Sequence, residues 1–259
     1  MDTFSAACIW LHDHWRAGTR TDAMPEALRP TDRATAYKVQ ACIEATSAEP
    51  LFGWKLAATS KAGQAHIGVD GPMAGRLLAE RRIEDGGDCV LGTNLMRVAE
   101  LEFAFRMARD LPPRATSYTQ DEVMAAVATL HPAIEVPDSR YNQFETAGEA
   151  QLIADNACAH RFVLGAATTA EWRGIDLATH AVRAFRNGEP AGNGTGANVL
   201  GDPRIALTWL ANELSAIGVT LKTGQAIITG TCVKPLPVAV GDRIEGDFGV
   251  LGKIALRFV

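Results

Sequence analysis

The sequence predicts an α+β fold, in which a helical N-terminal region over residues 1–50 precedes a β-rich body over residues 51–259. Three observations lead to this prediction. Apolar residues recur at helical spacing in the first fifty residues, short apolar runs of strand length follow from Leu51, and Gly, Pro and Asp separate these runs. The chain has 259 residues, of which 47% are hydrophobic, and this suffices for one large core or two small ones.

The N-terminal region is predicted to hold two helices. The first spans about residues 2–16, and Gly18 marks its end. The second runs over about residues 32–45, with Thr31 as its cap. The polar stretch between them, residues 18–30, contains two prolines and is expected to be a connector.

The body is predicted to consist mainly of strands, with two helices among them. Thr119 begins one helix with a capping box, and this helix is expected to end at His131 and Pro132. Asp202 begins the other as an N-cap before a proline, and Gly218 ends it. The predicted strands lie within residues 52–57, 89–107, 133–136, 226–229, 242–248 and 253–259.

Charge and hydropathy argue against two classes of partner. The formal net charge of −5 is not that of a nucleic-acid or anionic-membrane surface. No apolar run approaches the roughly 20 residues that cross a bilayer, and the N-terminus lacks the basic start and cleavage site of a signal peptide. Five scattered cysteines without a C-x-x-C pair are expected to be buried reduced thiols in a cytoplasmic protein.

The most informative segment is Arg97–Phe105, where two glutamates alternate with apolar residues. On a strand, Glu100 and Glu102 share one face about 7 Å apart, whereas on a helix they would point to nearly opposite sides. Both carboxylates can converge on one cation, which would relieve their mutual repulsion. The pattern fits equally well an edge strand that shows two solvated glutamates to water.

A third carboxylate follows in another strand candidate. Glu135 lies in an apolar tetrad bracketed by Pro132 and Pro137, an unfavourable place for an unpaired carboxylate. Three oxygen donors with several waters are typical ligands of Mg²⁺ or Mn²⁺. The alternative is that Glu135 faces water and that residues 138–140 form a surface turn.

Two further segments hold polar side chains among small or apolar residues. Lys55 lies in an apolar run, and a buried ammonium tends to lose its proton or to bind an anion, so it is a candidate for binding a carboxylate or moving protons. Spacing alone favours a lysine stem along the surface with its head in water. Asp155 and Asn156 either cap the next helical turn, which the local chemistry favours, or point into a site.

Two other motifs do not support a binding site. Residues 192–197 have the glycine spacing of a dinucleotide-binding loop but follow no hydrophobic strand, so a mobile loop or a glycine-rich turn is expected. His12 and His14 lie two residues apart on a predicted helix and cannot share a metal ion.

Taken in order along the chain, several segments resemble the 2-keto-4-pentenoate hydratase / 4-oxalocrotonate decarboxylase family, within the fumarylacetoacetate hydrolase superfamily. No single segment is specific, but the ordered set covers the chain from about Ala34 to its end. The matching segments are Trp54–Leu56, Thr59–Ala62, Glu100–Glu102, Pro132–Glu135 with Asp138 and Arg140, Asp155–Ala157, Gly194–Ala197, Trp209–Asn212, Gly230–Thr231, Pro235–Val238, Gly241–Asp242 and Asp247–Gly249.

The resemblance implies a mixed β-roll or sandwich core of the fumarylacetoacetate hydrolase type with a helical N-terminal region, usually assembled into oligomers. It also implies Mg²⁺ or Mn²⁺ held by Glu100, Glu102 and Glu135, and small 2-oxo or 2-hydroxydienoic acids from aromatic-ring degradation as substrates. Lys55 and Asp155 are then the candidate catalytic residues. The candidate substrate contacts are the backbone of Leu56, Asn156 and Thr231, and Arg76 is a candidate anchor for a second carboxylate.

The leading functional hypothesis is a metal-dependent hydratase, a lyase that adds water to a 2-hydroxyalkadienoate to give a 4-hydroxy-2-oxo acid. A decarboxylase of an unsaturated 2-oxo diacid comes second and an acylpyruvate hydrolase third. In the first two, a divalent ion chelated by the substrate would stabilise an enolate at C2. The alternative from another class is a non-catalytic partner of a related hydratase or decarboxylase subunit.

The chain departs from the family's usual pattern at two places. Family members commonly carry an acidic-proline-acidic-aromatic-glycine run after the Lys61 segment, where this chain reads Gly71–Arg76. Met73 thus replaces a carboxylate that could activate water, and Ala74 replaces an aromatic wall. A Ser-Phe-Thr stretch often found after the late strand reads Thr231–Val233. We therefore expect the metal-binding half of the site to be kept and the contacts to the far end of the substrate to differ.

Overall fold

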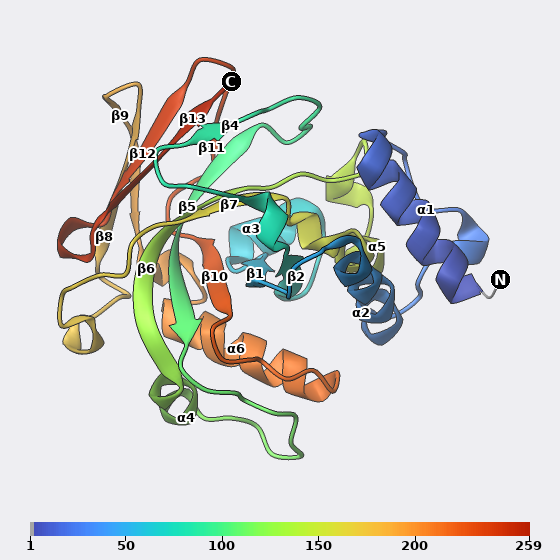
Figure 1. Cartoon of the computed structure of the whole chain (residues 1–259), viewed down its shortest axis with the longest axis horizontal. Helices are drawn as coiled ribbons and strands as arrows, with labels where there is room; N and C mark the ends of the chain where they lie inside the picture. Colours follow the sequence, from blue (N-terminus) through green and yellow to red (C-terminus); the bar gives the residue numbers. More distant parts are fainter. Residues whose placement is uncertain (1–2) are drawn as a thin grey trace.

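Two β-sheets and the helices packed on them organise residues 3–259, which are the residues that this computed structural model describes (Figure 1). The larger sheet has eight strands in the order β2-β1-β10-β5-β6-β7-β3, with β11 paired to β5, and the smaller sheet has five in the order β4-β13-β12-β8-β9. Both parallel and antiparallel pairs occur in each sheet. The expected α+β class is therefore confirmed.

The bounds of the elements are as follows. The α-helices are α1 (Thr3–Ala17), α2 (Arg33–Ala41), α3 (Lys61–Ile67), α4 (Gln120–Ala125), α5 (Glu149–Ala154) and α6 (Pro203–Ala216). The larger sheet holds β1 (Gly53–Ala57), β2 (Met73–Leu77), β3 (Arg82–Ile83), β5 (Val98–Met107), β6 (Val127–Val136), β7 (Arg161–Leu164), β10 (Ala226–Thr231) and β11 (Leu236–Pro237). The smaller sheet holds β4 (Asp88–Cys89), β8 (Ala181–Arg186), β9 (Glu189–Thr195), β12 (Arg243–Asp247) and β13 (Lys253–Phe258).

The N-terminal helices lie at the opposite end of the molecule from the smaller sheet (Figure 1). Helix α1 ends just before Gly18, whose φ of +64° is left-handed as expected of a helix stop. Asp32, rather than Thr31, caps α2, because its carboxylate accepts the backbone N–H of Thr35 at 2.8 Å. The predicted second helix is divided, since α2 is followed by the 3₁₀-helix η2 (Cys42–Thr46).

A disulfide between Cys8 and Cys42 joins α1 to η2, with the two Cα atoms 5.8 Å apart. The expectation of reduced thiols is wrong for this pair, because α1 packs across α2 and η2 and so brings together two cysteines that are distant in sequence. The other three, Cys89, Cys158 and Cys232, are free and buried as expected.

The two helices predicted in the body differ in how well their ends are predicted. The capping box of Thr119 is present, but α4 ends at Ala125 instead of reaching His131. The following residues form β6, which pairs with both β5 and β7, and His131 is buried on this strand with its Nδ1 2.8 Å from the Gly165 carbonyl oxygen. Helix α6 begins after the N-cap Asp202, as predicted.

Residues 192–197 are mostly strand, which corrects the expectation of a loop. They belong to β9, which pairs with β8, and to the short turn that follows it. A Cβ atom at Gly194 would lie 1.9 Å from the carbonyl oxygen of Cys232, and one at Gly196 would lie 2.1 Å from that of Leu177. These glycines therefore permit close backbone packing, which explains a spacing that resembles a nucleotide loop.

The larger sheet is strongly curled. Its two edge strands, β2 and β3, follow one another in the chain and are joined only by residues 78–81, so the two edges lie close together. On the concave face lies a compact apolar cluster, and half of its residues are alanines, whose small side chains accommodate the curl. This cluster consists of Leu77, Ala104, Ala133, Ala159, Phe162, Leu164, Ala226 and Ile228.

None of the helices within residues 3–259 combines the length and the apolar character that a bilayer-spanning helix requires.

Candidate metal centre

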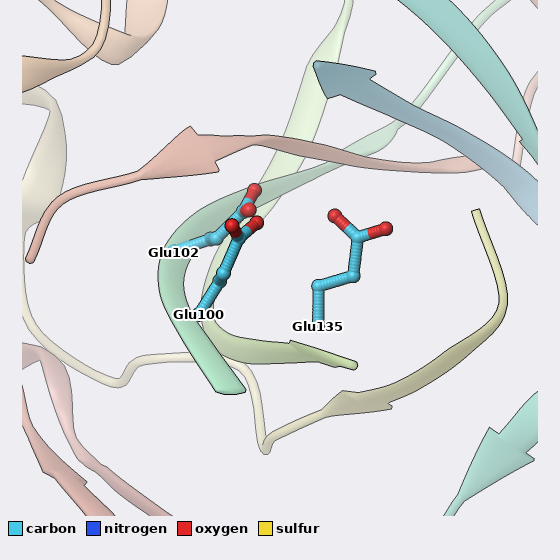
Figure 2. Close-up of side chains that lie close together, drawn as sticks. All are labelled: Glu100, Glu102 and Glu135. Carbon is cyan, nitrogen blue, oxygen red and sulfur yellow. The ribbon is translucent and has the colours of Figure 1, made fainter. Parts of the chain in front are cut away.

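Three glutamates from two neighbouring strands converge on one point of the concave face. Strands β5 and β6 are antiparallel, and their register places Glu100 directly opposite Glu135 and Glu102 opposite Ala133. Because residues two apart on a strand share a face, all three carboxylates lie on the same side of the sheet. One carboxylate oxygen from each residue lies within 4.8 Å of the others, and Figure 2 shows the three groups directed into the same space.

Burial leaves these carboxylates without enough donors. Glu102 and Glu135 are fully buried and Glu100 is half-buried, so the solvated-strand alternative is wrong for the first two. The backbone N–H of Gly230 donates to Oε2 of Glu102. Oε1 of Glu102 and Oε2 of Glu135 accept no hydrogen bond, and the Lys55 ammonium is the one cationic partner of Oε1 of Glu135 among the described residues. Buried carboxylate oxygens are costly without a counter-charge, and a hard divalent cation is the partner that three such groups fit.

The pKa values of the triad follow from this burial. Desolvation raises the pKa of Glu100, and it raises the pKa of Glu102 well above the usual range with further repulsion from Glu135 and Glu100. Desolvation also raises the pKa of Glu135 to about 7, although the Lys55 ammonium opposes this shift. In the absence of a cation the cluster therefore retains protons near neutral pH, and a metal ion that binds there must displace them.

Lys55 supplies a positive charge to this cluster. Its Nζ lies 3.1 Å from Oε1 of Glu135 and donates a 2.9 Å hydrogen bond to the carbonyl oxygen of Ala157. The side chain is 3% exposed, so the alternative of a stem along the surface is wrong. Burial disfavours the ammonium, but the carboxylates of Glu135 and Glu100 outweigh it, and the pKa of Lys55 lies above its usual value. Lys55 is therefore charged.

The ion pair between Lys55 and Glu135 depends on the curl of the sheet. Strands β1 and β6 are separated by β10 and β5. In a flat sheet with strands about 4.8 Å apart, β1 and β6 would be roughly 14 Å from one another, which is beyond the reach of these two side chains. The curl brings the strands to face each other across the concave side, so that charged groups from the first and second thirds of the chain meet.

A left-handed turn holds the carbonyl that binds Lys55. Asn156, Ala157 and Cys158 form the 3₁₀-type turn η5 with φ values of +59°, +49° and +61°. Three successive non-glycine residues rarely adopt this conformation. Asn156 fixes it by accepting the Arg76 backbone N–H at 2.6 Å and donating to the Arg76 carbonyl oxygen at 2.8 Å. Asn156 thus ties the turn to β2 rather than capping a helix.

Asp155 directly precedes this turn and is fully buried. Its Oδ2 accepts the hydroxyl of Ser139 and the backbone N–H of Arg140, each at 2.7 Å, whereas Oδ1 has no hydrogen-bond partner. Burial raises the pKa of Asp155 to about 7, even though both hydrogen bonds favour the carboxylate. Asp155 is not one of the three converging carboxylates, and it is a second acidic group that titrates near neutrality.

The remaining candidates lie at different distances from the triad. Thr231 pairs with Glu102 across β10 and β5, and its hydroxyl donates to the Val233 carbonyl oxygen at 2.5 Å. Leu56 follows Lys55 on β1 and points to the opposite face of the sheet, so that only its backbone borders the Lys55 side. Met73 pairs with Ala57, which places it on the face that carries Lys55.

The Arg76 side chain is not brought to the triad. Arg76 pairs with Trp54 across β2 and β1, on the face opposite Lys55, and its Cζ lies 4.6 Å from the centroid of the Trp54 ring. Its guanidinium forms a 2.5 Å ion pair with Glu44 and a hydrogen bond with the Gln40 side chain. These contacts engage Arg76 with the N-terminal region.

Two contacts of the site had no signal in the residue pattern. Ala157 contributes only a carbonyl group, and nothing about an alanine indicates a left-handed turn. Ser139 binds Asp155 although both stand in segments without helical or strand periodicity. Gly230 is different, because its φ of +112° and a would-be Cβ 2.0 Å from Oγ1 of Thr59 require glycine, and an isolated glycine in a strand pattern signals such close approach.

Comparisons with known proteins show which sequences this chain is similar to. Residues 83–259 match the family model described as fumarylacetoacetate (FAA) hydrolase C-terminal. A 2-hydroxyhexa-2,4-dienoate hydratase from Comamonas testosteroni is 35% identical over 214 residues, which are 82% of this chain and 80% of that protein. A 4-oxalocrotonate decarboxylase from Pseudomonas sp. (strain CF600) is 33% identical over 209 residues, which are 81% of this chain and 78% of that protein.

A solved structure resembles the whole chain. The 4-oxalocrotonate decarboxylase from Pseudomonas putida G7, complexed with magnesium and adipate, superposes with a TM-score of 0.89 at 29% sequence identity and covers 99% of this chain and 97% of its own. This similarity confirms the predicted β-roll type of fold with its helical N-terminal region. The chain therefore belongs to the 2-keto-4-pentenoate hydratase / 4-oxalocrotonate decarboxylase family within the fumarylacetoacetate hydrolase superfamily.

Proposed function

We propose that this protein is a metal-dependent hydratase that adds water to a 2-hydroxy-2,4-dienoate, or the corresponding unsaturated 2-oxo acid, to give a 4-hydroxy-2-oxo acid in the catabolism of aromatic compounds. The observation that carries this proposal is the convergence of Glu100, Glu102 and Glu135, with buried oxygens that lack donors, beside a charged Lys55. Hydratase-named relatives are 30–35% identical over most of the chain, so the chain is an enzyme of this lyase class that acts on a small molecule.

The triad would hold Mg²⁺ or Mn²⁺. Three carboxylates from two strands offer the hard oxygen donors that these ions prefer, and neither thiolate nor imidazole belongs to the set. When bound, such an ion supplies a Lewis acid that stabilises negative charge on the C2 oxygen of a 2-oxo acid. The hydrogen bond from Gly230 orients Glu102 for this role.

Lys55 and Asp155 are the residues that we assign to catalysis. The Lys55 ammonium is held at the edge of the triad and would bind the substrate's C1 carboxylate or pass a proton to the carbon skeleton. Asp155, with its pKa raised by burial to about 7, exchanges a proton readily at neutral pH. The backbone of Leu56, the turn at Asn156 and Thr231 are the proposed contacts with the rest of the substrate.

A second candidate function is decarboxylation of an unsaturated 2-oxo diacid. Met73, on the face that carries Lys55, cannot act as a base, whereas the family resemblance leads us to expect a carboxylate at this position. The full-length similarity to a decarboxylase structure also favours this candidate. An apolar side chain at this position leaves hydration dependent on another base, whereas decarboxylation requires none to activate water.

One experiment separates the two functions. The purified protein with Mg²⁺ is incubated with 2-hydroxypenta-2,4-dienoate and, separately, with 2-oxohex-3-enedioate. A hydratase removes the dienoate absorbance and yields a 4-hydroxy-2-oxo acid, whereas a decarboxylase releases CO₂ from the diacid. Both activities should vanish with a chelator. A protein that consumes neither substrate until a related subunit is added would instead be a partner subunit, and the proposal would be abandoned.

We also propose that the protein is a homo-oligomer in the cytoplasm, as expected from its family and sequence. Light scattering of the purified chain measures the first property, and fractionation of the source cells measures the second.

A further inference from the structure

A cluster of basic residues lies where the end of α1 meets the start of β7. We call it the basic cluster, and none of its residues belongs to the glutamate triad. His160, one residue before β7, is its centre, and four guanidinium groups act on this ring electrostatically. The four are Arg20, Arg81, Arg140 and Arg161.

Direct contacts hold the cluster together. Nη2 of Arg20 lies 2.8 Å from Oδ2 of Asp138, and Nη2 of Arg140 binds the same oxygen. The guanidinium of Arg140 stacks on Trp15 of α1, with its Cζ 3.8 Å from the ring centroid. The His160 ring also contacts Trp15, with the two ring centroids 5.4 Å apart.

His160 connects this pair of arginines to the others. Its Nε2 lies 3.5 Å from Nη1 of Arg81. Arg161 follows it directly in the chain, and Arg81 and Arg161 repel each other electrostatically. Burial together with these positive charges lowers the pKa of His160 to about 2, so the ring is neutral at any ordinary pH and can accept or donate a hydrogen bond.

Several donors of the basic cluster have no acceptor. The Nε atoms of Arg20, Arg140 and Arg161, and Nδ1 of His160, are buried without a hydrogen-bond partner. Arg140 is the most enclosed, since only 2% of it is exposed. Buried donors of this kind are normally satisfied in a native protein, and each one left alone requires an explanation.

The charges of the cluster are also unbalanced. Within residues 3–259, Asp138 is the carboxylate that forms ion pairs with Arg20 and Arg140, whereas Arg81 and Arg161 form no ion pair. Asp155 also attracts the Arg140 guanidinium electrostatically, so the four arginines still outnumber the carboxylates beside them. Glu80 attracts the adjacent Arg81 electrostatically but forms no ion pair with it, because its carboxylate accepts hydrogen bonds from Ser47 and the Ala48 backbone N–H. A surplus of enclosed positive charge is unfavourable unless an anion neutralises it.

We propose that the basic cluster binds the phosphate group of a small molecule, either free phosphate or a phosphate monoester. A phosphate dianion offers several acceptor oxygens, and the planar guanidinium fork binds such oxygens in pairs. The dianion would compensate most of the surplus charge and supply acceptors to donors that lack them. Arg81, Arg161 and His160 are half-buried, so the ligand enters from their side.

Binding of phosphate to protein kept free of metal by a chelator tests this proposal. Calorimetry and thermal unfolding are measured with inorganic phosphate, glycerol phosphate, succinate and sodium chloride at equal ionic strength. We expect saturable binding of at least one phosphate compound and a raised melting temperature, without a comparable effect of succinate or chloride. Tighter binding of the ester than of free phosphate would indicate a phosphorylated metabolite, and the reverse would indicate phosphate itself.

Substitutions locate the site. Arg81→Gln and Arg161→Gln each should weaken phosphate binding at least 10-fold, because each removes a charged donor from a half-buried position that tolerates a polar residue. Arg82→Gln is the matched control, since Arg82 is adjacent in sequence but pairs with Glu84 on the surface. Equal affinities of Arg81→Gln, Arg82→Gln and the unchanged protein would overturn the proposal, as would chloride or succinate acting as strongly as phosphate.

Discussion

The charge of the candidate metal centre depends on a few side chains. Three carboxylates face one ammonium. When no metal ion is bound, burial raises the pKa of each carboxyl group, and bound protons then compensate the remaining negative charge. A divalent ion would replace these protons and would compete with Lys55 for Glu135. The single residues of the centre therefore differ in what their loss should do.

Glu102→Gln should abolish metal-dependent turnover, with kcat/KM falling at least about 100-fold, because the amide keeps the shape but loses the charge that binds the ion. Calorimetric titration with Mg²⁺ should show no binding, while circular dichroism stays unchanged. Glu84→Gln, on the surface with its side chain 80% exposed, is the control. Activity that survives both Glu102→Gln and chelation would contradict the metal assignment.

Lys55→Met should reduce kcat much more than it reduces Mg²⁺ affinity. The substitution removes the ammonium 3.1 Å from Glu135 but leaves all three carboxylates in place. Metal binding is expected to be unchanged or tighter, because the ion no longer competes with the ammonium. Steady-state kinetics and calorimetry on the same preparation measure both quantities, and a parallel loss of metal affinity and turnover would show that Lys55 only supports the triad.

Acid should stabilise the metal-free protein through Glu135. The pKa of this carboxyl group is raised by burial to about 7 in the folded chain from its ordinary value of 4.5. Between these values the folded state binds a proton that the unfolded chain lacks, so this contribution to stability is lost as pH rises through 7. In a chelator, the free energy of unfolding of the unchanged protein minus that of Glu135→Gln should fall from pH 5 to pH 8. A difference independent of pH would refute the shifted pKa.

Single elements position these side chains, and β10 shows how. Gly230 lies on it with a φ of +112°, and its N–H reaches Glu102 only because no side chain stands against Thr59. The turn η5 performs a similar task for Lys55 with residues whose backbone conformation is itself unfavourable.

Gly230→Ala should therefore destabilise the protein and weaken metal binding. Gly224→Ala is the control, because Gly224 also has a positive φ of +78° but a Cβ added there would have no neighbouring atom within 4 Å. Gly224→Ala should lower the free energy of unfolding by about 1 kcal/mol, because alanine disfavours the left-handed conformation. Gly230→Ala should cost about 1–3 kcal/mol more because of the clash with Thr59. Denaturant unfolding measures both, and equal losses would mean that the close contact relaxes freely.

The elements also show what a sequence can and cannot predict. The strands that carry Lys55, Glu100 and Glu102 follow from alternation and apolar runs, and the capping box at Thr119 marks a real helix start. The end of that helix was not predictable, because pairing of residues 127–136 with two strands overrides local helical preference. Likewise η5, the disulfide and the Asp155–Ser139 contact depend on tertiary packing, which leaves no periodic trace.

At the scale of the whole molecule, the N-terminal helices are part of the structure that supports the site. The Gln40 side chain on α2 donates to the carbonyl oxygens of Ala74 at 2.7 Å and Ile153 at 2.8 Å, and Tyr37 accepts the Ala74 backbone N–H at 3.0 Å. These contacts join α2 to β2 and α5, the elements on either side of Asn156. Near residue 50 the secondary structure changes from helices to strands. The division of the chain into two regions at this point stays a prediction.

A chain of residues 51–259 expressed alone should fail to unfold cooperatively. Without α2, the buried backbone groups of Ala74 and Ile153 lose their partners, each at a cost of about 1–3 kcal/mol. The full chain should show one transition at which near-ultraviolet circular dichroism and tryptophan fluorescence coincide. A fragment with the same melting temperature as the full chain would prove the body independent.

The curl of the larger sheet has a kinetic consequence. The ammonium and the carboxylate that it brings together belong to strands far apart in the chain, and they meet only after β1, β10, β5 and β6 have all paired. High contact order of this kind makes folding slow, and the metal-binding triad is therefore incomplete early in folding. Magnesium should thus leave the refolding rate nearly unchanged and act instead by retarding unfolding.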